Sequence, residues 1–131
     1  MVRVPLQLRY RPRAGMVAWA FHRLSGVGIF LFVLLHVVDI YLAGANPALY
    51  DEVLAFYASI PGRILETVLG AALLYHALNG LRIVTIDFWP RLSRYHRGLW
   101  RLNWILFILI GIPVTLVIAR QFLRSLGWIP A

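Results

Sequence analysis

Three long apolar stretches divide the chain, and each is long enough to cross a lipid bilayer as a helix. The first, residues 24–44, runs for 21 residues without Lys or Arg. A helix rises about 1.5 Å per residue, so about 20 residues cross a hydrocarbon layer about 30 Å thick. The other two stretches cover residues 64–86 and 102–122. The pattern therefore predicts three transmembrane helices.

The second stretch differs from the others because it carries polar side chains. Glu66, His76, Asn79 and Arg82 lie within it. Such groups are costly in contact with lipid and usually turn toward a bundle interior. We therefore expect them to face other helices, and we expect this helix to carry the function. The third stretch is almost wholly apolar and is interpreted as scaffold, with Pro113 as a predicted kink.

The connection between the first two stretches has a helix start signal. Asn46 is a favoured N-cap residue, and Pro47 suits the first helical position. We predict a short helix over residues 47–58 that lies at the membrane interface. Its apolar side would face the membrane, while Asp51 and Glu52 would face water.

The positive charges indicate the orientation in the membrane. All 13 basic residues are Arg, against five acidic residues, which gives a net charge of +8. Ten arginines fall on the side of the N-terminus, and three fall on the other side. The larger group is Arg3, Arg9, Arg11, Arg13, Arg23, Arg82, Arg91, Arg94, Arg97 and Arg101, and the smaller group is Arg63, Arg120 and Arg124. By the positive-inside rule, the N-terminus is predicted to be cytoplasmic.

The composition argues against several classes of protein. Hydrophobic residues make up 61% of the chain, more than a soluble domain of this size can bury. Cysteine is absent, which excludes disulfides and thiolate-held clusters within this chain. The arginines form no stripe interleaved with aromatic residues, so we expect no nucleic-acid partner. A transporter or channel is disfavoured because no charges line a path across the bilayer. We expect one transmembrane domain over residues 1–131, completed by helices of a partner.

Two histidines within the apolar stretches are candidate metal ligands. Gly80 follows His76 by four residues and lies on nearly the same helix face, which leaves room beside the imidazole. This spacing suits a haem ligand, and it also suits a histidine that only hydrogen-bonds between helices. His36 lies about 20 Å deeper than Arg23 along the first helix. It is a candidate ligand of a second haem, or a hydrogen-bonding partner of Asp39. Because the depths differ, we predict that His36 and His76 do not bind the same haem.

Polar residues also gather where the first two helices reach the predicted cytoplasmic surface. His22, Arg23 and Ser25 begin the first helix, and Arg82 and Asp87 end the second. Arginine presents a planar fork that pairs well with carboxylates, and this group of donors suits a haem propionate or a quinone carbonyl. The alternative is ordinary anchoring of long basic side chains at the membrane surface.

Two motifs give the chain a family resemblance. The first helix begins His22-Arg23-Leu24-Ser25-Gly26, and the second contains His76-Ala77-Leu78-Asn79-Gly80-Leu81-Arg82 followed by Asp87-Phe88. They resemble the His-Arg-x-Ser/Thr-Gly and His-x-x-x-Gly-x-Arg-His-x-x-x-Asp motifs of the cytochrome b membrane-anchor subunit of succinate dehydrogenase. The resemblance covers residues 19–89. Two positions differ, since Ile83 replaces the second motif's later histidine and Trp19 replaces a serine implicated in quinone binding.

The resemblance implies a cofactor and a substrate. His76 would be an axial ligand of haem b, with the other ligand donated by a second anchor subunit. His22 and Arg23 would lie near the haem propionates and the pocket for ubiquinone or menaquinone. The implied fold is an all-α membrane protein of three transmembrane helices, part of a larger haem-containing helical bundle.

The resemblance also implies partners and a location. A flavoprotein subunit, an iron–sulfur subunit and a second membrane anchor would complete the complex, which could assemble as a trimer in the inner membrane of a bacterium. The flavoprotein would oxidise succinate, and quinone would be reduced at the anchor. Two alternatives stay open, namely the anchor of a fumarate reductase and a haem-free structural anchor.

Overall fold

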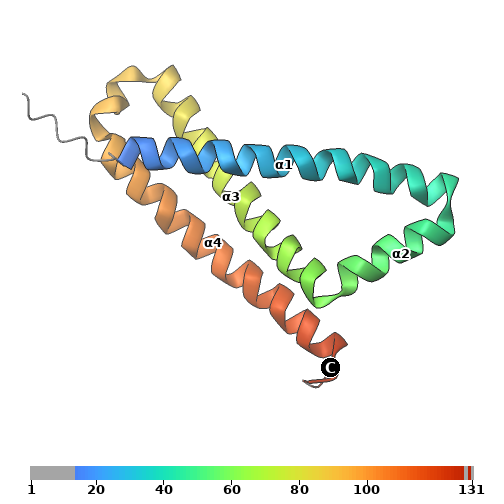
Figure 1. Ribbon diagram of the computed structural model, residues 1–131. Coiled ribbons are helices and arrows are strands. Elements are labelled where there is room, and N and C mark those ends of the chain that lie inside the picture. Colours follow the sequence, from blue (N-terminus) through green and yellow to red (C-terminus); the bar gives the residue numbers. More distant parts are fainter. Residues whose placement is uncertain (1–13, 129, 131) are drawn as a thin grey trace, which may run out of the picture.

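The computed structural model describes residues 14–128 and 130, and nearly all of them are helical (Figure 1). The elements in chain order are α1 (Ala14–Ala45), α2 (Pro47–Ala58), α3 (Ile60–Phe88), the short 3-10 helix η1 (Pro90–Tyr95) and α4 (His96–Ser125). Three long helices, α1, α3 and the stretch from η1 into α4, are apolar enough to cross a membrane. The described residues contain no strand. The predicted all-α membrane fold with three spans is confirmed.

The helices extend beyond the apolar stretches that predict them. α1 begins ten residues before residue 24, and α3 begins four residues before residue 64. An apolar stretch stops at the first charged side chain, whereas a helix continues through arginine, which is a good helix former. Helix ends follow the caps instead, and the side chain of Ser59 accepts a hydrogen bond from the Gly62 N–H at the start of α3.

The helix α2 covers the residues for which the sequence predicts a short helix. The Asn46 side chain accepts a hydrogen bond from the Leu49 N–H at 3.2 Å, and Pro47 occupies the first turn. Asp51 and Glu52 are both exposed. The position of α2 at the membrane interface and the cytoplasmic N-terminus stay predictions. Four of the arginines behind the orientation lie within residues 1–13, outside the described residues.

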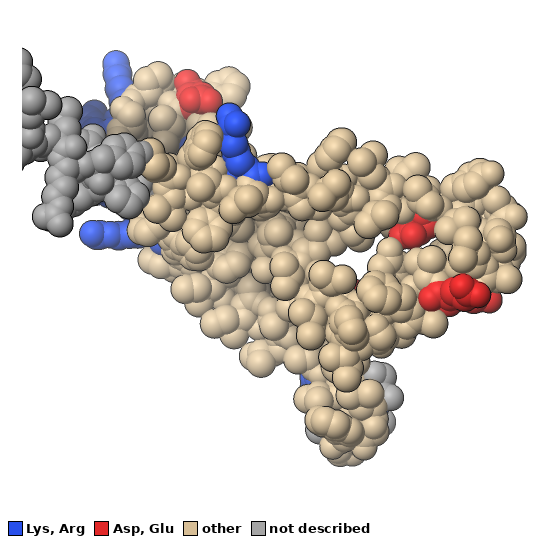
Figure 2. All heavy atoms as spheres, in the orientation of Figure 1, with Lys and Arg blue, Asp and Glu red and all other residues tan. Residues whose placement is uncertain are grey.

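The helices outline a triangle (Figure 1). α1 and α3 cross near the first half of α1, then diverge, and α2 joins their far ends. α4 runs back alongside α3. In the space-filling view, an opening passes through the molecule between α1 and the pair α2 and α3 (Figure 2). The only large hydrophobic side chain that is buried among the described residues is Tyr75. The helices therefore do not form a closed core of their own.

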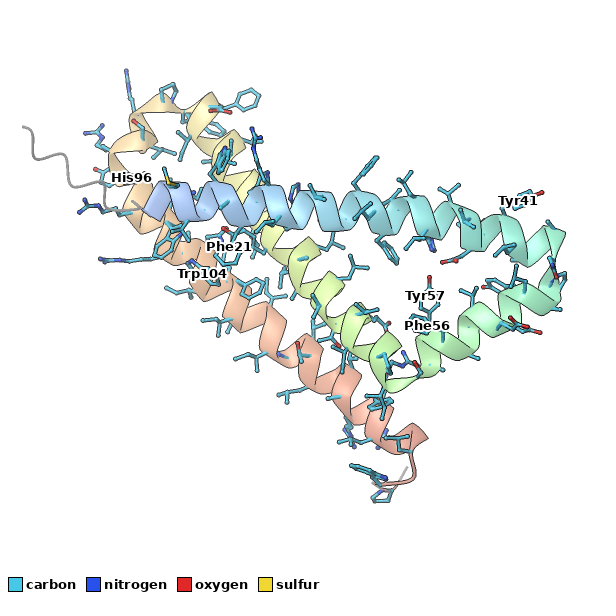
Figure 3. The ribbon with its side chains drawn as sticks, viewed as in Figure 1. Phe21, Tyr41, Phe56, Tyr57, His96 and Trp104 are labelled. Carbon is cyan, nitrogen blue, oxygen red and sulfur yellow. The ribbon has the colours of Figure 1, made fainter. Side chains whose placement is uncertain are left out.

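An aromatic cluster fastens the three long helices together. The ring of Tyr75 in α3 lies 5.8 Å from that of Phe21 in α1 and 5.5 Å from that of Trp104 in α4, measured between centroids. The ring of Phe107 in α4 also lies 6.1 Å from that of Tyr75. Figure 3 shows Phe21 and Trp104 on the same side of the crossing. Pairs of this kind each contribute about 0.5–1.5 kcal/mol beyond their buried area.

The structure bears on two residues singled out in the sequence, Glu66 in α3 and Pro113 in α4. Glu66 does not face another helix of this chain, because its carboxylate is exposed and pairs with Arg63 at 2.8 Å. The early start of α3 puts both residues in its first two turns, where an i,i+3 pair forms on the helix surface. Pro113 lies inside α4 and does not end it.

Candidate functional site

The crossing of α1 and α3 brings two predicted site residues into direct contact. The imidazole rings of His22 and His76 stack with centroids 3.9 Å apart and planes 9° from parallel. A Cβ atom added to Gly26 would lie 3.0 Å from Cε1 of His76, and one added to Gly80 would lie 3.6 Å from Cε1 of His22. Each glycine follows a histidine by four residues, so it lies one turn along on the same helix face. Gly26 therefore makes room for the His76 ring, whereas a Cβ atom at position 80 would make an ordinary contact with the His22 ring.

The Nδ1 atom of His76 is held from α1. It lies 3.1 Å from the main-chain carbonyl oxygen of His22 and 3.1 Å from Oγ of Ser25. A carbonyl oxygen only accepts hydrogen bonds, so this network assigns the ring hydrogen to Nδ1. The lone pair is then on Nε2. A neutral imidazole in this form has Nε2 available as a metal ligand.

Further polar groups are buried around the crossing. Asn79 is 1% exposed, and its Oδ1 accepts a hydrogen bond from Nη1 of Arg82 at 3.1 Å. Among the described residues, Nδ1 of His22, Nε of Arg82 and both amide atoms of Asn103 are buried without a hydrogen-bond partner. Leaving such a group unpaired costs about 1–3 kcal/mol. This region therefore has hydrogen-bonding capacity that a polar ligand or water would satisfy.

Two predicted site residues lie apart from the stacked histidines. The guanidinium of Arg23 is exposed and lies 4.6 Å from the centroid of the Trp19 ring, in a cation–π contact. Trp19 is also the residue that replaces the serine implicated in quinone binding in the family. Asp87 is exposed one residue before the end of α3. The structure thus brings together His22, Ser25 and His76, whereas Arg82 is hydrogen-bonded to Asn79 on its own helix.

His36 occupies a different part of α1. It follows His22 by 14 residues, which is about 21 Å along a helix, and its exposed ring stacks on Phe32 at 5.4 Å. Asp39, one turn further, accepts a hydrogen bond from the Tyr57 hydroxyl at 2.6 Å (Figure 3). Donation to this carboxylate raises the pKa of Tyr57 to about 12. This end of α1 is therefore tied to α2 and holds no second histidine beside His36 among the described residues.

A separate groove runs between α3 and α4. Its volume is about 420 Å³, and it is lined mainly by apolar side chains, among them Leu74, Phe107 and Ile118. None of the predicted site residues lines it. The groove is a different feature from the polar site at the crossing.

Sequence reasoning missed three residues that shape the site. Tyr75 packs beside His76 and donates a hydrogen bond to the Ala18 carbonyl at 3.4 Å. Trp104 belongs to the aromatic cluster, with its ring against those of Tyr75 and Phe107. Asn103 is 4% exposed. The available signals were the aromatic residues directly preceding both His22 and His76, and a lone amide in an apolar helix.

Comparison with known proteins places these residues in a family context. Residues 4–118 match the family described as succinate dehydrogenase/fumarate reductase transmembrane subunit. The chain is 39% identical over 116 residues to the succinate dehydrogenase 2 membrane subunit SdhC of Mycobacterium tuberculosis, covering 88% of this chain and 85% of that protein. It is 38% identical over 78 residues to the succinate dehydrogenase hydrophobic membrane anchor subunit of Halobacterium salinarum, covering 56% of this chain and 58% of that protein. The family match includes both stacked histidines.

Proposed function

This chain belongs to the succinate dehydrogenase/fumarate reductase transmembrane subunit family, and on that premise we propose that it is the haem b-bearing anchor of a succinate:quinone oxidoreductase. His76 would ligate the haem iron through Nε2, and a second anchor subunit would supply the other axial ligand. The observation that carries this proposal is the hydrogen bonding of His76 Nδ1, which leaves Nε2 as the free nitrogen.

The residues at the crossing fit such a group. Histidines that bind metals almost always donate the other ring N–H to a carbonyl, a carboxylate or water, which fixes the tautomer and the ring orientation. His76 has this arrangement, and its ring is only partly buried within the chain. When bound, haem b supplies a site that takes up and releases one electron at a time. The protein contributes the ligand, its orientation and the polar groups around it.

The polar groups beside the stacked histidines would hold the charged or polar edges of the haem and the quinone. Nε of Arg82 is buried and has no hydrogen-bond partner among the described residues, and the same is true of Nδ1 of His22. Either group can donate to a propionate or to a quinone oxygen as negative charge develops there. Arg23 and Asp87, which are exposed, would lie at the cytoplasmic edge of this region. Electrons would arrive from an iron–sulfur subunit on that side, and ubiquinone or menaquinone would accept them.

The surface of the chain supports a role within a larger assembly. Large hydrophobic side chains are exposed along all three spans, so lipid and the helices of a partner must cover them. Arginine side chains gather over the end of the molecule formed by η1 and the adjoining ends of α3 and α4 (Figure 2). The exposed ones include Arg91, Arg94, Arg97 and Arg101. This face would meet the iron–sulfur subunit, with the flavoprotein beyond it, at the cytoplasmic side of a bacterial inner membrane.

Purification of the complex through a tag on this chain tests the proposal. The reduced-minus-oxidised spectrum should show a low-spin haem b, and the complex should reduce quinone with succinate. His76→Ala should lose the low-spin α band, while the matched variant His36→Ala should keep it. A complex that reduces quinone without any haem would make the chain a structural anchor. If only His36→Ala loses the haem, the axial ligand is His36, toward the other end of α1, and not His76.

A further inference from the structure

We propose that Ser25 is a positioning residue for His76, whose hydroxyl oxygen accepts the Nδ1 hydrogen and thereby sets the orientation and donor strength of Nε2. The inference deepens the proposed function and rests on it for the haem measurement. It starts from three short contacts among three residues. Oγ of Ser25 lies 2.9 Å from the His22 carbonyl oxygen, and Nδ1 of His76 lies 3.1 Å from each of these two oxygens.

The His22 carbonyl oxygen and Oγ of Ser25 do not accept the Nδ1 hydrogen of His76 equally. Because α1 is helical through this turn, the His22 carbonyl lies where the Gly26 N–H donates to it. The Ser25 hydroxyl donates to the same carbonyl. A carbonyl oxygen has two lone pairs, and these two donors occupy them. The Nδ1 hydrogen of His76 is therefore left with Oγ of Ser25 as its main acceptor.

The other tautomer of His76, with the lone pair on Nδ1 and the hydrogen on Nε2, is unfavourable. If Nδ1 carried the lone pair, the Ser25 hydroxyl would have to turn from the carbonyl toward the ring. The Nδ1 lone pair would then face the lone pairs of the His22 carbonyl at 3.1 Å. The carbonyl thus selects the tautomer with hydrogen on Nδ1, the serine hydroxyl accepts that hydrogen, and Nε2 is free.

The serine also fixes the ring in space. Ser25 is 8% exposed, so little water can replace its hydroxyl. The His22 ring covers one face of the His76 imidazole, and Ser25 holds its Nδ1 edge. These two contacts come from one turn of α1. Without the hydroxyl, the Nδ1 hydrogen would lose its main acceptor and would be left with the His22 carbonyl alone, which it shares with the Gly26 N–H.

Two measurable consequences follow for a bound haem. Outer partners of a ligating histidine raise its basicity, and their loss typically costs about 10–100-fold in metal affinity. A weaker imidazole donor stabilises ferric haem less than before, so the midpoint potential should rise when Ser25 loses its hydroxyl. A tenfold change in the ratio of ferric to ferrous affinity corresponds to ~59 mV for a one-electron couple.

The test compares three variants of the whole purified complex. Ser25→Ala removes the hydroxyl, and Ser25→Thr retains it. Thr67→Ala is the matched control, because the Thr67 hydroxyl donates to the Arg63 carbonyl of its own helix at 2.8 Å and touches no histidine. Redox titration gives the haem potential, transfer of haem to apomyoglobin gives its release rate, and solid-state NMR of complex labelled with ¹⁵N-histidine reports the His76 tautomer.

We expect Ser25→Ala to raise the potential by tens of millivolts, up to ~59 mV for a tenfold effect, and to release haem about tenfold faster. Ser25→Thr and Thr67→Ala should match the unmodified complex. An assembled Ser25→Ala complex with unchanged potential and release rate would overturn the inference. Equal shifts in Ser25→Ala and Ser25→Thr would also overturn it, because they would reveal a packing effect.

The NMR measurement separates this inference from the proposed function. If the purified complex binds no haem at all, the proposed function fails, but the His76 nitrogens can still be observed. Protonated Nδ1 in the unmodified complex, and an Nδ1 resonance shifted by a weaker hydrogen bond in Ser25→Ala, would support the role of Ser25. An Nδ1 resonance at the same position in both complexes would contradict it. His76→Gln identifies the signals by their disappearance.

Discussion

Replacing Gly26 with alanine would place one methyl group against the His76 ring. The new Cβ would lie 3.0 Å from Cε1 and 3.5 Å from Nδ1 of that ring. Carbon atoms in contact normally lie about 3.5–4.0 Å apart, so the ring must move away from α1 by about 0.5 Å. The ring cannot make this movement without changing its contacts with His22 and Ser25, which belong to the same turn of α1.

The cost can be worked from these contacts. A movement of about 0.5 Å lengthens the 3.1 Å contacts of Nδ1 to about 3.6 Å, which is too long for a hydrogen bond. Loss of such a bond costs about 1 kcal/mol, and overpacking costs about 1–3 kcal/mol. Alanine returns about 1 kcal/mol because it favours the helix over glycine. Gly26→Ala should therefore destabilise the complex by about 1–3 kcal/mol and disturb the haem.

The matched control lies two residues further along α1. A Cβ atom added to Gly28 would meet nothing within 4 Å, so Gly28→Ala should be neutral or stabilising by up to about 1 kcal/mol. Thermal unfolding and the haem spectrum of both purified variants provide the comparison. If Gly26→Ala has the stability and spectrum of Gly28→Ala, the close approach of α1 to His76 is not present in the assembled protein.

Three further predictions concern the connections between helices and the topology. Gly62→Ala should lower the thermal stability by about 1–3 kcal/mol, because its Cβ would meet the backbone of the last turn of α2, whereas Gly70→Ala has open space and should not. Tyr57→Phe should cost about 1 kcal/mol through the lost hydrogen bond to α1. Since the fold raises the pKa of Tyr57 from 10.0 to about 12, this contribution should be complete below pH 10 and should shrink as the pH rises toward 12. If the stability difference between Tyr57→Phe and the unmodified protein stayed constant from pH 10 to about pH 12, the hydrogen bond from Tyr57 to Asp39 would not be its cause. In intact cells, an impermeant thiol reagent should label Ala48→Cys and not Ser93→Cys, and the reverse pattern would invert the topology.

The sequence was sufficient to predict the spans, because each depends only on the length of an apolar stretch. It also predicted α2 from the Asn46 cap and Pro47, which act locally. It did not predict that His22 stacks on His76. That contact depends on the rotation and crossing angle of α1 against α3, which the spacing of residues along either helix does not determine. Gly80 indicated room beside the His76 imidazole, but not which side chain would use the space.

For Arg23 and Glu66, the sequence-based predictions overlooked partners on the same helix. Glu66 was predicted to face other helices, and Arg23 was predicted to lie near a haem propionate or a quinone at the cytoplasmic surface. Each instead has a partner on its own helix, Trp19 for Arg23 and Arg63 for Glu66. A neighbour three or four residues away is always within reach on a helix, so such a local pair competes with any distant partner. The sequence contained both neighbours, and helical spacing would have paired them.

Rescue of a ligand-deleted variant tests the central proposal most directly. His76→Gly removes the imidazole and leaves a cavity between α1 and α3. The purified His76→Gly complex should lack the low-spin haem b spectrum, and added imidazole should restore it, because the free ligand can occupy the vacated position. A low-spin spectrum in His76→Gly without added imidazole would show that His76 is not the ligand.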